Sequence, residues 1–380
     1  MADSTRAGRY VSQPQGYRAF VPNPLPPEPP VAVDAMLLRL LSAADCALGR
    51  LDGAASILPN PDFFVSMYVR QEAVLSSQIE GTQSTLEDVL AYEAGARGAD
   101  APRDLAEVVN YVKAMNHGLA RLAELPLSLR LIREIHGRLL EGVRGSERTP
   151  GEFRRSQNWI GPAGCTLNNA AYVPPAVHDM LPALDDLEKF LHDESLPVLV
   201  QAGLAHAQFE TIHPFLDGNG RVGRLLIAFL LCWRGALHRP LLYLSLYLKA
   251  HRQEYYDRLN AIRVEGDWEG WLRFFLAGVA DVADGATRTA RAILDLREEH
   301  RRLVASKARK ASSAHALLDM LFMNPIVTPS AVQHGLECTF KTANTLVNDF
   351  VAWGLLEETT GKQRNRRFRY GPYLALLPTA

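Results

Sequence analysis

The chain has 380 residues, of which 47% are hydrophobic and 22% charged, a composition typical of a globular protein with two or three domains. A formal net charge of −1 excludes a global attraction to nucleic acid or membranes, so any anion-binding site has to be local. The four cysteines are scattered without metal-ligand spacing, and no apolar run approaches the roughly 20 residues that span a bilayer. We expect a cytoplasmic protein without disulfides, structural zinc or a membrane span.

The N-terminal third is predicted to combine an extended arm with helices. Residues up to about 33 should be extended, because PNPLPPEPP has six prolines in nine positions. From residue 34 to about 125 the apolar pattern is helical. One helix, FFVSMYVRQEAVLSSQIEG, should end at Gly81, and Ser84 should open a capping box, STLE, for the next helix. Glu80 in the last turn opposes the helix dipole, which indicates a cationic partner elsewhere.

A break in the helical pattern follows. Residues 151–175, GEFRRSQNWIGPAGCTLNNAAYVPP, mix aromatic, β-branched and turn-forming residues, and are predicted to form a short β-hairpin. Helical patterning resumes over about 177–213 and again after Arg224, where the helix is almost wholly apolar. A long charged helix then leads to a last unit that begins near Ala311. We therefore expect a mainly α-helical protein.

The loop between the two central helices, TIHPFLDGNGRVGR (211–224), raises several alternatives. Its glycines have the GxGxxG spacing of a dinucleotide site, but a helical stretch precedes it and no acidic residue follows before Glu254. A calcium loop from Asp217 is excluded, because Arg221 and Val222 occupy positions that need an oxygen ligand and a glycine. A plain helix–turn–helix corner does not explain why such a loop stands where a buried helix begins.

The residue types of this loop suit phosphate chemistry. Successive glycines and a helix N-terminus expose backbone N–H groups that bind phosphate oxygens. Arg221 and Arg224 are cationic forks for the same anion. Asp217 can hold a magnesium ion that bridges phosphates, and His213 is a base with a pKa expected near neutrality. Together these residues predict phosphoryl or nucleotidyl transfer.

At every specified position, HPFLDGNGRVGR resembles the signature of the Fic (filamentation induced by cAMP) family, His-x-Phe-x-Asp/Glu-Gly-Asn-Gly-Arg-x-x-Arg. Members of that family are mostly protein adenylyltransferases, which move AMP from ATP to a hydroxyl side chain of a protein and release pyrophosphate. The resemblance spans roughly residues 63–279 and implies a helical core around the loop, with the hairpin as a flap that aligns the target. It implies ATP and Mg²⁺ at the site, and Ser, Thr or Tyr hydroxyls of target proteins and of the chain itself as acceptors.

The resemblance also implies a role for each residue of the loop. His213 would deprotonate the target hydroxyl, Asp217 would hold Mg²⁺, and Arg221 and Arg224 would bind the outer phosphates. On the adenine side, HRQEYYDRL is similar to a family helix, although a tyrosine pair also suits core packing. The implied nucleotide-binding residues are Glu80, Ile160, Gly161, Asp217, Gly218, Asn219, Gly220, Arg221, Gly223, Arg224, Tyr255 and Tyr256.

The segment SSQIEG resembles the inhibitory motif of the family, Ser/Thr-x-x-x-Glu-Gly/Asn, with Ser76 and Glu80 one turn apart on one helix face. The resemblance implies that Glu80 forms a salt bridge with Arg224, blocks the γ-phosphate site and leaves ATP in an unproductive pose. The motif precedes the catalytic loop in the same chain, as in class II of the family. In some relatives the same glutamate orients a water that removes AMP from a modified protein, so both reactions stay open here.

The last unit is predicted to contain a helix, a short helix, a helix and a basic hairpin, which resembles a winged helix-turn-helix. DNA binding would require the second helix of the motif in a groove and the wing on phosphates. The exposed side of that helix is only weakly basic, so dimerisation or target recruitment are alternatives to DNA binding. The basic residues of the hairpin are Lys362, Arg364, Arg366, Arg367 and Arg369.

Four predicted domains follow from this reading: an N-terminal arm and helical region with the inhibitory helix (1–110), the catalytic core (111–285), a linker helix (286–310) and the winged helix (311–380). The predicted partners are ATP, a protein substrate, a second copy of the chain in a homodimer, and DNA through the winged helix, without a membrane. Transfer of another phosphate-linked group through the same loop is one alternative function. A DNA-binding regulator with a nucleotide-sensing core is another, although His213 argues against it, since a sensor needs no base.

Overall fold

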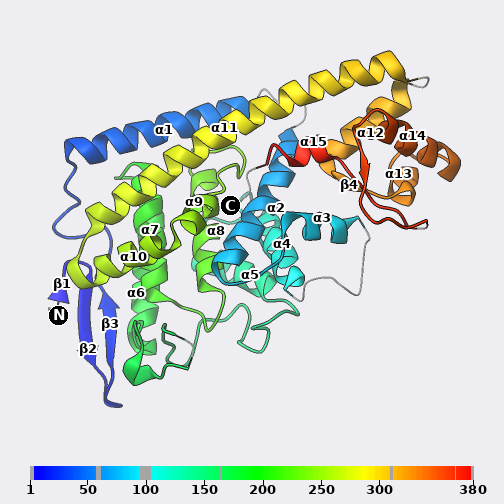
Figure 1. The fold of residues 1–380 in the computed structure, drawn as a ribbon. Coiled ribbons are helices and arrows are strands. Elements are labelled where there is room, and N and C mark those ends of the chain that lie inside the picture. Colours follow the sequence, from blue (N-terminus) through cyan, green and yellow to red (C-terminus); the bar gives the residue numbers. More distant parts are fainter. Residues whose placement is uncertain are drawn as a thin grey trace.

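Helices make up most of the computed structural model, which describes residues 4–56, 61–94, 104–162, 164–308, 311–363 and 365–377. The expected mainly α-helical fold is confirmed. Two long helices, α1 (Ala35–Ser56) and α11 (Trp268–Lys307), pack along each other on one side of the molecule, and α11 continues to the C-terminal elements (Figure 1). Because α11 is unbroken, the boundary predicted at residue 285 between core and linker falls inside one helix.

A pair of buried helices, α7 (Val198–Ile212) and α8 (Asn219–Trp233), forms the centre of the fold. Most side chains of both helices are buried, which explains the apolar runs on either side of the loop that joins them. Core packing therefore fixes both ends of this loop. The surrounding core helices are α2 (Pro61–Ile79), α3 (Leu86–Glu93), α4 (Leu105–Arg121), α5 (Leu129–Leu139), α6 (Val177–Leu191), α9 (Ser245–Ala250) and α10 (Arg252–Glu265).

The N-terminal residues form a three-stranded antiparallel sheet, so the prediction of an extended arm is wrong there. Strand β1 (Ser4–Thr5) pairs with β2 (Gly8–Ser12), which pairs with β3 (Arg18–Pro22). Gly16, in the left-handed region with φ 87°, allows the turn between β2 and β3. Phe20 is buried, and its N–H donates to a backbone carbonyl of the segment before α6 (2.9 Å). The sheet is thereby attached to the segment that precedes α6.

The flap, residues 151–175, is less regular than the predicted hairpin. Ile160 and Tyr172 form an antiparallel bridge through backbone hydrogen bonds of 2.8 and 3.0 Å, and the described residues beside them do not extend it into a ladder. A 3-10 turn, η1 (Leu167–Asn169), occupies the tip and prevents continued pairing. Tyr172 also donates its hydroxyl to the carbonyl of Thr211 (2.6 Å), which fixes the flap to the end of α7.

The connection between α2 and α3 differs by one residue from the predicted capping box. Thr85, rather than Ser84, caps α3: its hydroxyl accepts the Asp88 N–H (3.2 Å), and its own N–H donates to Asp88 Oδ2 (2.8 Å). Ser84 is buried and donates its hydroxyl to Asp104 Oδ1 (2.7 Å) instead. Gly81 has φ 99°, as expected for the residue that terminates α2.

The C-terminal unit begins with α12 (Ala311–Met323), α13 (Pro329–Gly335) and α14 (Phe340–Ala352). The predicted order of helix, short helix, helix and hairpin is present, while the winged-helix assignment itself stays a prediction. Arg364, one of the basic residues predicted for the hairpin, lies outside the described residues. An antiparallel sheet in the order β4-β6-β5 and a last short helix complete the unit, with bounds β4 (Ile326–Val327), β5 (Glu357–Glu358), β6 (Phe368–Arg369) and α15 (Gly371–Leu374).

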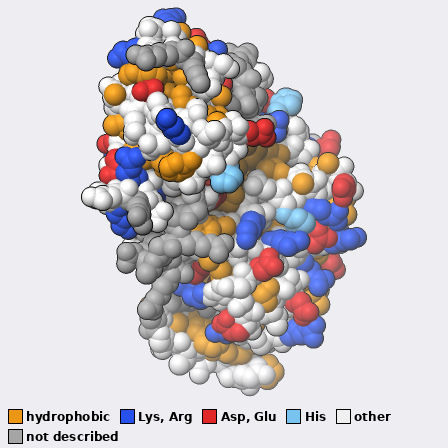
Figure 2. All heavy atoms as spheres, turned by 90° about the vertical axis from the view of Figure 1, so that its right-hand side faces the viewer, with side chains coloured by type: hydrophobic (Ala, Val, Ile, Leu, Met, Phe, Trp, Pro, Cys, Tyr) orange, Lys and Arg blue, Asp and Glu red, His pale blue; other side chains and the backbone are white. Residues whose placement is uncertain are grey.

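The C-terminal unit is seated on α2 and α3. Arg369 forms ion pairs of 2.6 Å with Glu87 of α3 and with Glu357 of its own sheet, so one of the predicted basic residues is engaged within the chain. Figure 2 faces this side of the molecule and shows lysine and arginine side chains mixed with acidic ones rather than gathered in one basic stripe. A single uniform surface for the DNA backbone is therefore not visible on this face.

Two expectations from composition can be compared with the structure. Among the described helices, none combines the length and the apolar character needed to cross a bilayer. The four cysteines all lie within the described residues and are free thiols, as expected for a chain without disulfides.

Candidate active site

The loop between α7 and α8 is held in one shape by its own side chains. His213 follows the last residue of α7 in the left-handed conformation (φ 49°), and its N–H donates to the carbonyl of Phe209 (2.9 Å). Asn219 and Phe215 exchange two hydrogen bonds of 2.8 Å, one from the Phe215 N–H and one from the Asn219 amide. Gly218, with φ 76°, then lets the chain turn into α8. The side chain of Asn219 thus stabilises the loop, and only its backbone faces outward from the helix N-terminus.

Two flap residues that the sequence analysis did not select hold the backbone of His213. Arg154 donates from Nε, and Asn158 from its amide, to the His213 carbonyl, each over 3.1 Å. Asn158 also donates to the carbonyl of Phe215 (2.8 Å). Arg154 is 1% exposed, which is unusual for an arginine and is compensated by these bonds. No local pattern in the flap sequence indicated either role.

The environment of His213 favours the neutral imidazole. Burial, with a further contribution from Arg154, lowers the pKa of His213 to about 4. The expectation of a pKa near neutrality is therefore wrong for this structure, because burial disfavours the charged form. At neutral pH the ring carries a free lone pair and can accept a proton, as a general base must.

His136 of α5 supports the loop from below. Its ring stacks on Phe215 with centroids 3.7 Å apart and planes 7° from parallel. Because its Nδ1 accepts the Gly151 N–H (2.8 Å), its Nε2 carries the proton and donates to the carbonyl of Asp217 (3.1 Å). Burial lowers the pKa of His136 to about 4, which keeps this arrangement neutral. His136 was not among the residues selected from the sequence.

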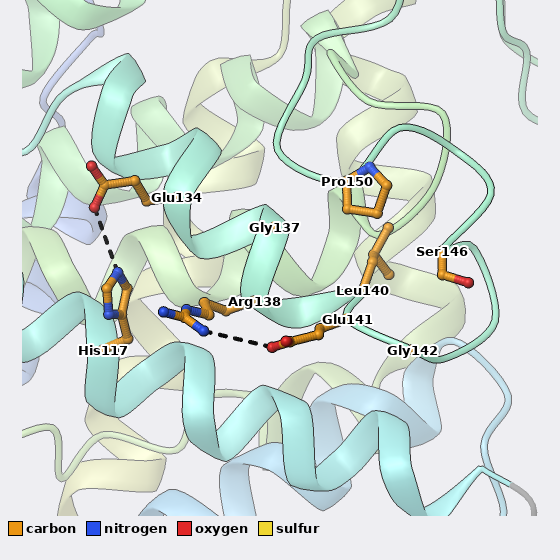
Figure 3. A pocket seen from close by; sticks show the side chains of 9 residues that line it. All are labelled: His117, Glu134, Gly137, Arg138, Leu140, Glu141, Gly142, Ser146 and Pro150. Carbon is orange, nitrogen blue, oxygen red and sulfur yellow. Dashed lines mark ion pairs between the residues drawn. The ribbon is translucent and has the colours of Figure 1, made fainter.

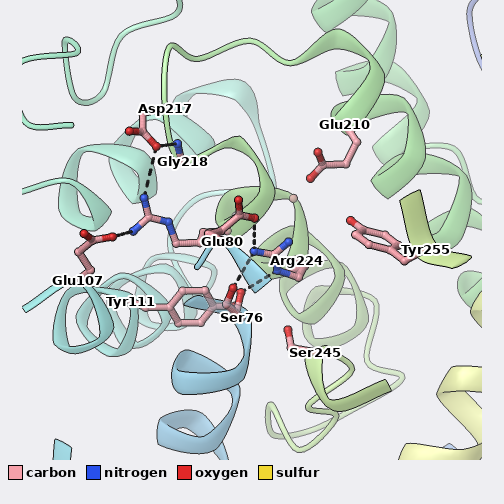
Figure 4. Close-up of polar contacts among 12 residues, drawn as sticks. Ser76, Glu80, Glu107, Tyr111, Glu210, Asp217, Gly218, Arg224, Ser245 and Tyr255 are labelled. Atoms are coloured by element: carbon pink, nitrogen blue, oxygen red, sulfur yellow. Dashed lines mark hydrogen bonds and ion pairs between the residues drawn. The ribbon is translucent and has the colours of Figure 1, made fainter. Parts of the chain in front are cut away.

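Arg224 of α8 is bound from the end of α2 (Figure 4). Its Nε donates to Ser76 Oγ (2.8 Å), and its Nη2 donates to the carbonyl of Ser76 (3.0 Å) and to Glu80 Oε1 (2.7 Å). The ion pair between Glu80 and Arg224 that the resemblance implies is therefore present. Removal from water opposes ionisation, but Arg224, with smaller contributions from Arg221 and His213, lowers the pKa of Glu80 below its ordinary value. The pair is charged on both sides at neutral pH.

The carboxylate of Glu80 lies directly on the first turn of α8. A Cβ atom placed on Gly220 would be 2.2 Å from Glu80 Oε1 and 3.0 Å from Arg224 Nη1, so glycine is required for this approach. The first turn of a helix leaves N–H groups without intrahelical acceptors and attracts anions. Glu80 therefore occupies the place where an anionic ligand would bind.

Arg221 is held by two carboxylates. Its Nη1 donates to Glu107 of α4 (3.0 Å), and its Nη2 lies 3.5 Å from Asp217 Oδ1. Arg144 reaches the same Glu107 oxygen over 3.4 Å. Arg221 is 1% exposed, and its Nε has no hydrogen-bond partner among the described residues. Glu107 is a further residue that sequence reasoning did not find, because it comes from a helix remote in the chain.

The remaining predicted residues divide between core and surface. Tyr255 is 1% exposed and donates its hydroxyl to His206 Nε2 (2.9 Å), while His206 Nδ1 donates to the carbonyl of Gly223 (2.9 Å). Tyr256, in contrast, is 40% exposed. Ile160 is 38% exposed in the flap, so the structure leaves it and Tyr256 accessible to a ligand, and commits Tyr255 to packing.

The donor set at this site fits a nucleotide phosphate with a magnesium ion. Asp217 lies at the mouth of the loop with 35% of its side chain exposed, and its Oδ1 accepts the Gly218 N–H (2.6 Å). Mg²⁺ prefers such oxygen ligands, and usually binds one or two carboxylates together with phosphate oxygens and waters. The unpartnered Arg221 Nε and the helix N-terminus beside Gly220 suit the phosphate oxygens.

A surface pocket lies behind this loop, between α4, α5 and the residues that follow (Figure 3). His117 and Glu134 form an ion pair of 3.5 Å at one end, and Arg138 and Glu141 form one of 3.7 Å near the centre. Its lining contains none of the predicted site residues. It borders the site through Leu140, whose side chain would be 3.6 Å from a Cβ atom at Gly218. The predicted site residues therefore lie outside this pocket.

Comparison with known families identifies two matching regions. The Fic/DOC family N-terminal domain matches residues 38–120, and the Fic/DOC family domain matches residues 126–231. The second region contains the loop described above, and the first contains Ser76 and Glu80.

The chain is also similar to curated proteins named protein adenylyltransferase Fic. The protein from Drosophila grimshawi is 33% identical over 196 residues, which are 51% of this chain and 36% of that protein. The protein from Aedes aegypti is 32% identical over 212 residues, 55% of this chain and 37% of that protein. The chain thus spans little more than a third of the length of the curated relatives that it matches.

Solved structures show the same fold. A Fic family protein from Desulfovibrio desulfuricans G20 superimposes with a TM-score of 0.57 over 90% of this chain and 97% of that chain, at 20% identity. A Fic domain containing signaling protein from Bacteroides thetaiotaomicron gives a TM-score of 0.51 over 68% of this chain and 97% of that chain, at 18% identity. At these identities the likeness concerns the fold alone.

Proposed function

The chain belongs to the Fic/DOC family, and on that premise we propose that it transfers AMP from ATP to hydroxyl side chains of proteins, itself included, under inhibition by its own Glu80. The observation that carries the proposal is the joint arrangement of a neutral, partly buried base, His213, and an anion site at the start of α8. The Fic/DOC family domain matches residues 126–231, which contain both, and curated relatives named protein adenylyltransferase Fic are similar to about half of the chain.

The proposed reaction follows from these positions. His213 Nε2 accepts the proton of the target hydroxyl, whose oxygen bonds to the α-phosphorus of ATP. The bond between the α-phosphorus and the bridging oxygen breaks, and pyrophosphate leaves with the electron pair. The first turn of α8, Arg221 and Arg224 bind the phosphate oxygens. Asp217 would hold Mg²⁺, which when bound neutralises charge on the phosphates.

The proposed inhibition follows from the position of Glu80. Its carboxylate lies over Gly220 and bonds to Arg224, so the anion site and one of its arginines are both taken. A γ-phosphate has to displace this carboxylate before Arg224 can bind it. Because 32% of the Glu80 side chain is exposed, water also reaches it. That exposure supports a second reaction at the same site, in which Glu80 orients a water molecule that removes AMP from a modified protein.

Two alternative functions have less support. Transfer of another phosphate-linked group would use the same loop, but every position of the adenylyltransferase signature is filled here. A DNA-binding regulator with a nucleotide-sensing core would not need His213 as a base, and its basic hairpin would have to release Arg369 from Glu87 and Glu357.

The proposal is tested by intact-mass spectrometry after incubation with Mg²⁺ and ATP. Glu80→Gly should gain the mass of AMP on a Ser, Thr or Tyr of the chain, more than the wild type does. Glu80→Gly combined with His213→Ala should gain none. The matched control is Glu337→Gly, an exposed glutamate with φ 48° where glycine fits without strain. If Glu80→Gly gains no AMP at any ATP concentration, AMP transfer is not the activity of this chain.

A further inference from the structure

A buried carboxyl group beside the base has no part in the reaction described above. Glu210 lies on the last turn of α7, one turn before His213, and is 8% exposed. Its Oε1 has no hydrogen-bond partner among the described residues, and its Oε2 lies 3.9 Å from His213 Nδ1. His213 Nδ1 is also buried and makes no well-formed hydrogen bond in the described part of the chain, although the backbone carbonyl of Glu210 lies near enough to act on the ring. Two unsatisfied buried groups side by side are costly and call for a functional explanation.

Gly223 of α8 provides the space for this carboxyl group. A Cβ atom at residue 223 would lie 2.6 Å from Glu210 Oε1, closer than real contacts, so only glycine admits the carboxyl here. Gly223, predicted from sequence to bind nucleotide, therefore has a packing role beside Glu210. Figure 4 shows the Glu210 carboxylate on the side of α8 where Arg224 and the hydroxyl of Tyr255 also lie. The carboxyl group thus points into the site and not toward solvent.

The cations near Glu210 have other partners. Arg224 donates to Ser76 and Glu80, and the guanidinium of Arg263 lies over the ring of Tyr172, 4.0 Å from its centre. Burial raises the pKa of Glu210 to about 7, with Arg224 opposing this and Glu80 adding to it. Near neutral pH a large fraction of the carboxyl groups is therefore ionised, and the imidazole of His213 is the neighbouring group whose Nδ1 lacks a well-formed hydrogen bond among the described residues.

We propose that Glu210 is a positioning residue for His213, an inference that rests on the proposed AMP transfer. A small rotation of the Glu210 side chain, which shortens the 3.9 Å separation, lets its carboxylate accept a hydrogen bond from Nδ1–H and leaves Nε2 as the unprotonated nitrogen that takes the hydroxyl proton. As that O–H bond breaks, Nε2 becomes protonated, the hydroxyl oxygen bonds to the α-phosphorus and pyrophosphate leaves. The charge of Glu210 stabilises the imidazolium until its proton passes to water. Glu210 does not touch the reacting atoms.

The kinetic test uses the full chain with Glu80→Gly, so that AMP incorporation can be measured. In that background Glu210→Gln, which keeps the shape and removes the charge, should lower kcat by about 10- to 100-fold, the usual effect of losing a residue that orients a functional group. The KM for ATP should stay within about twofold, because an effect confined to kcat marks a transition-state interaction. In a His213→Ala background Glu210→Gln should have no further effect. Glu298→Gln on the surface of α11 is the matched control and should leave kcat unchanged.

A second measurement is independent of activity. The nitrogen resonances of the His213 imidazole, assigned by their loss in His213→Ala, report which ring nitrogen carries the proton. The wild type should show a protonated Nδ1, and Glu210→Ala should lose this preference. If Glu210→Ala loses both thermal stability and the tautomer preference, the loss of preference could come from unfolding. Glu210→Gln then decides, because the same melting experiment shows whether this variant is folded.

Several outcomes would overturn the assignment. Unchanged kcat in Glu210→Gln, a loss that appears in KM for ATP, or an additional loss in the His213→Ala background would each show that Glu210 does not act through His213. An imidazole with Nε2 protonated in the wild type would do the same, even if no AMP transfer were detected. Failure of the proposed function is distinguishable, because it would appear as absent AMP incorporation in Glu80→Gly itself while the tautomer measurement still decides on Glu210.

Discussion

His213 adopts a backbone conformation that a side-chain-bearing residue rarely adopts, with φ 49°. Such a conformation costs about 1–3 kcal/mol and persists only where the surroundings enforce it. Here Arg154 and Asn158 bond its carbonyl, and the N–H bonds the end of α7. This conformation fixes the backbone from which the imidazole projects at the end of α7. The base is thus positioned by backbone contacts that are remote in sequence.

The first prediction at this scale concerns the base. His213→Ala in the Glu80→Gly background should lower AMP transfer by about 10²- to 10⁴-fold, because the variant removes the group that is proposed to take the hydroxyl proton. Affinity for a non-hydrolysable ATP analogue, measured by calorimetry, should be retained, since the imidazole does not bind the phosphates. Transfer that survives within about threefold of the parent would refute the role.

The second prediction concerns the proposed magnesium ligand. Asp217→Ala should lose AMP transfer together with the Mg²⁺-dependent part of the affinity for ATP, because the carboxylate and the phosphates share the ion. Calorimetric titrations with and without Mg²⁺ measure this difference. Asp349→Ala, an exposed aspartate of α14, is the control. Equal Mg²⁺ dependence in Asp217→Ala and the parent would exclude the assignment.

Part of this site could be predicted from the sequence, because the residues of that part are close together in the chain. The base, the loop glycines and both arginines lie in one run of fourteen residues. Glu107, His136 and Arg154 were not found, because each is a single residue in a segment without a local pattern, and their roles arise only when α4, α5 and the flap meet the loop in the folded chain. Glu210 directly precedes the run, but nothing in the apolar pattern of α7 indicated a role for it.

At the scale of elements, α2 carries one polar stripe on a buried helix. Glu72, Ser76 and Glu80 follow at intervals of four residues, so they share one face. Glu72 accepts hydrogen bonds from the Ser245 N–H (3.1 Å) and the Tyr111 hydroxyl (3.2 Å), and the other two bind Arg224. A single helix face thus connects α4, α8 and α9.

This stripe leads to a prediction about α2 and α8 together. Glu80→Gly should raise AMP incorporation by about tenfold or more, equivalent to at least about 1.4 kcal/mol of lost inhibition. Arg224→Ala breaks the same ion pair but removes the proposed γ-phosphate ligand, so it should not activate. The double variant should resemble Arg224→Ala alone. Rates measured over a range of ATP concentrations test this, and activation of the double variant would contradict it.

Helices and strands could be predicted from the sequence where the apolar pattern runs over many residues, and the prediction failed where the elements are short. The apolar runs of α7 and α8 identify buried helices directly. The N-terminal sheet was missed because the prolines of residues 22–30 dominate the composition, although they begin only at the last residue of β3 and do not interrupt it. The flap was predicted as a hairpin from residue types, whereas its tip folds into η1 and leaves one bridge. Ser84 and Thr85 both carry a hydroxyl that can cap α3. Ser84 binds Asp104 instead, a contact that the local sequence does not reveal.

For the whole molecule, the buried histidines and the buried glutamates have opposite effects on the free energy of unfolding as the pH falls. Burial lowers the pKa of His136, His206 and His213 to about 4, so their contribution to stability is present above their ordinary value and lost as pH falls toward 4. Burial raises the pKa of Glu72 and Glu210 to about 7, so each gains a proton in the folded state that the unfolded chain binds only near pH 4.5. Their effect is of opposite sign over most of the same pH range.

Glu72→Gln tests this balance. The folded wild type binds one proton more at residue 72 than the unfolded chain between its two pKa values, so this group adds stability as pH falls from about 7. Removing it should make the free energy of unfolding decrease more steeply between pH 6.5 and 5, by about 1.4 kcal/mol per pH unit. Urea unfolding at several pH values measures the slope. Glu298→Gln should leave it unchanged, and an equal slope in Glu72→Gln would contradict the prediction.

The seating of α2 also determines what opening the site would require. The helix packs against α4, α9 and α12, and Ser76 and Ser77 are fully buried, so it cannot withdraw without loss of the core. Glu80, however, follows the last helical residue, Ile79, and the amides of Glu80 and Gly81 make only local bonds to Ser77 and Gln78. The inhibited and open forms should therefore differ by a local opening of the last turn, with a free energy far below that of global unfolding. Amide hydrogen exchange should be fast at residues 80–82 and slow along the rest of α2, and bound ATP should accelerate only the former.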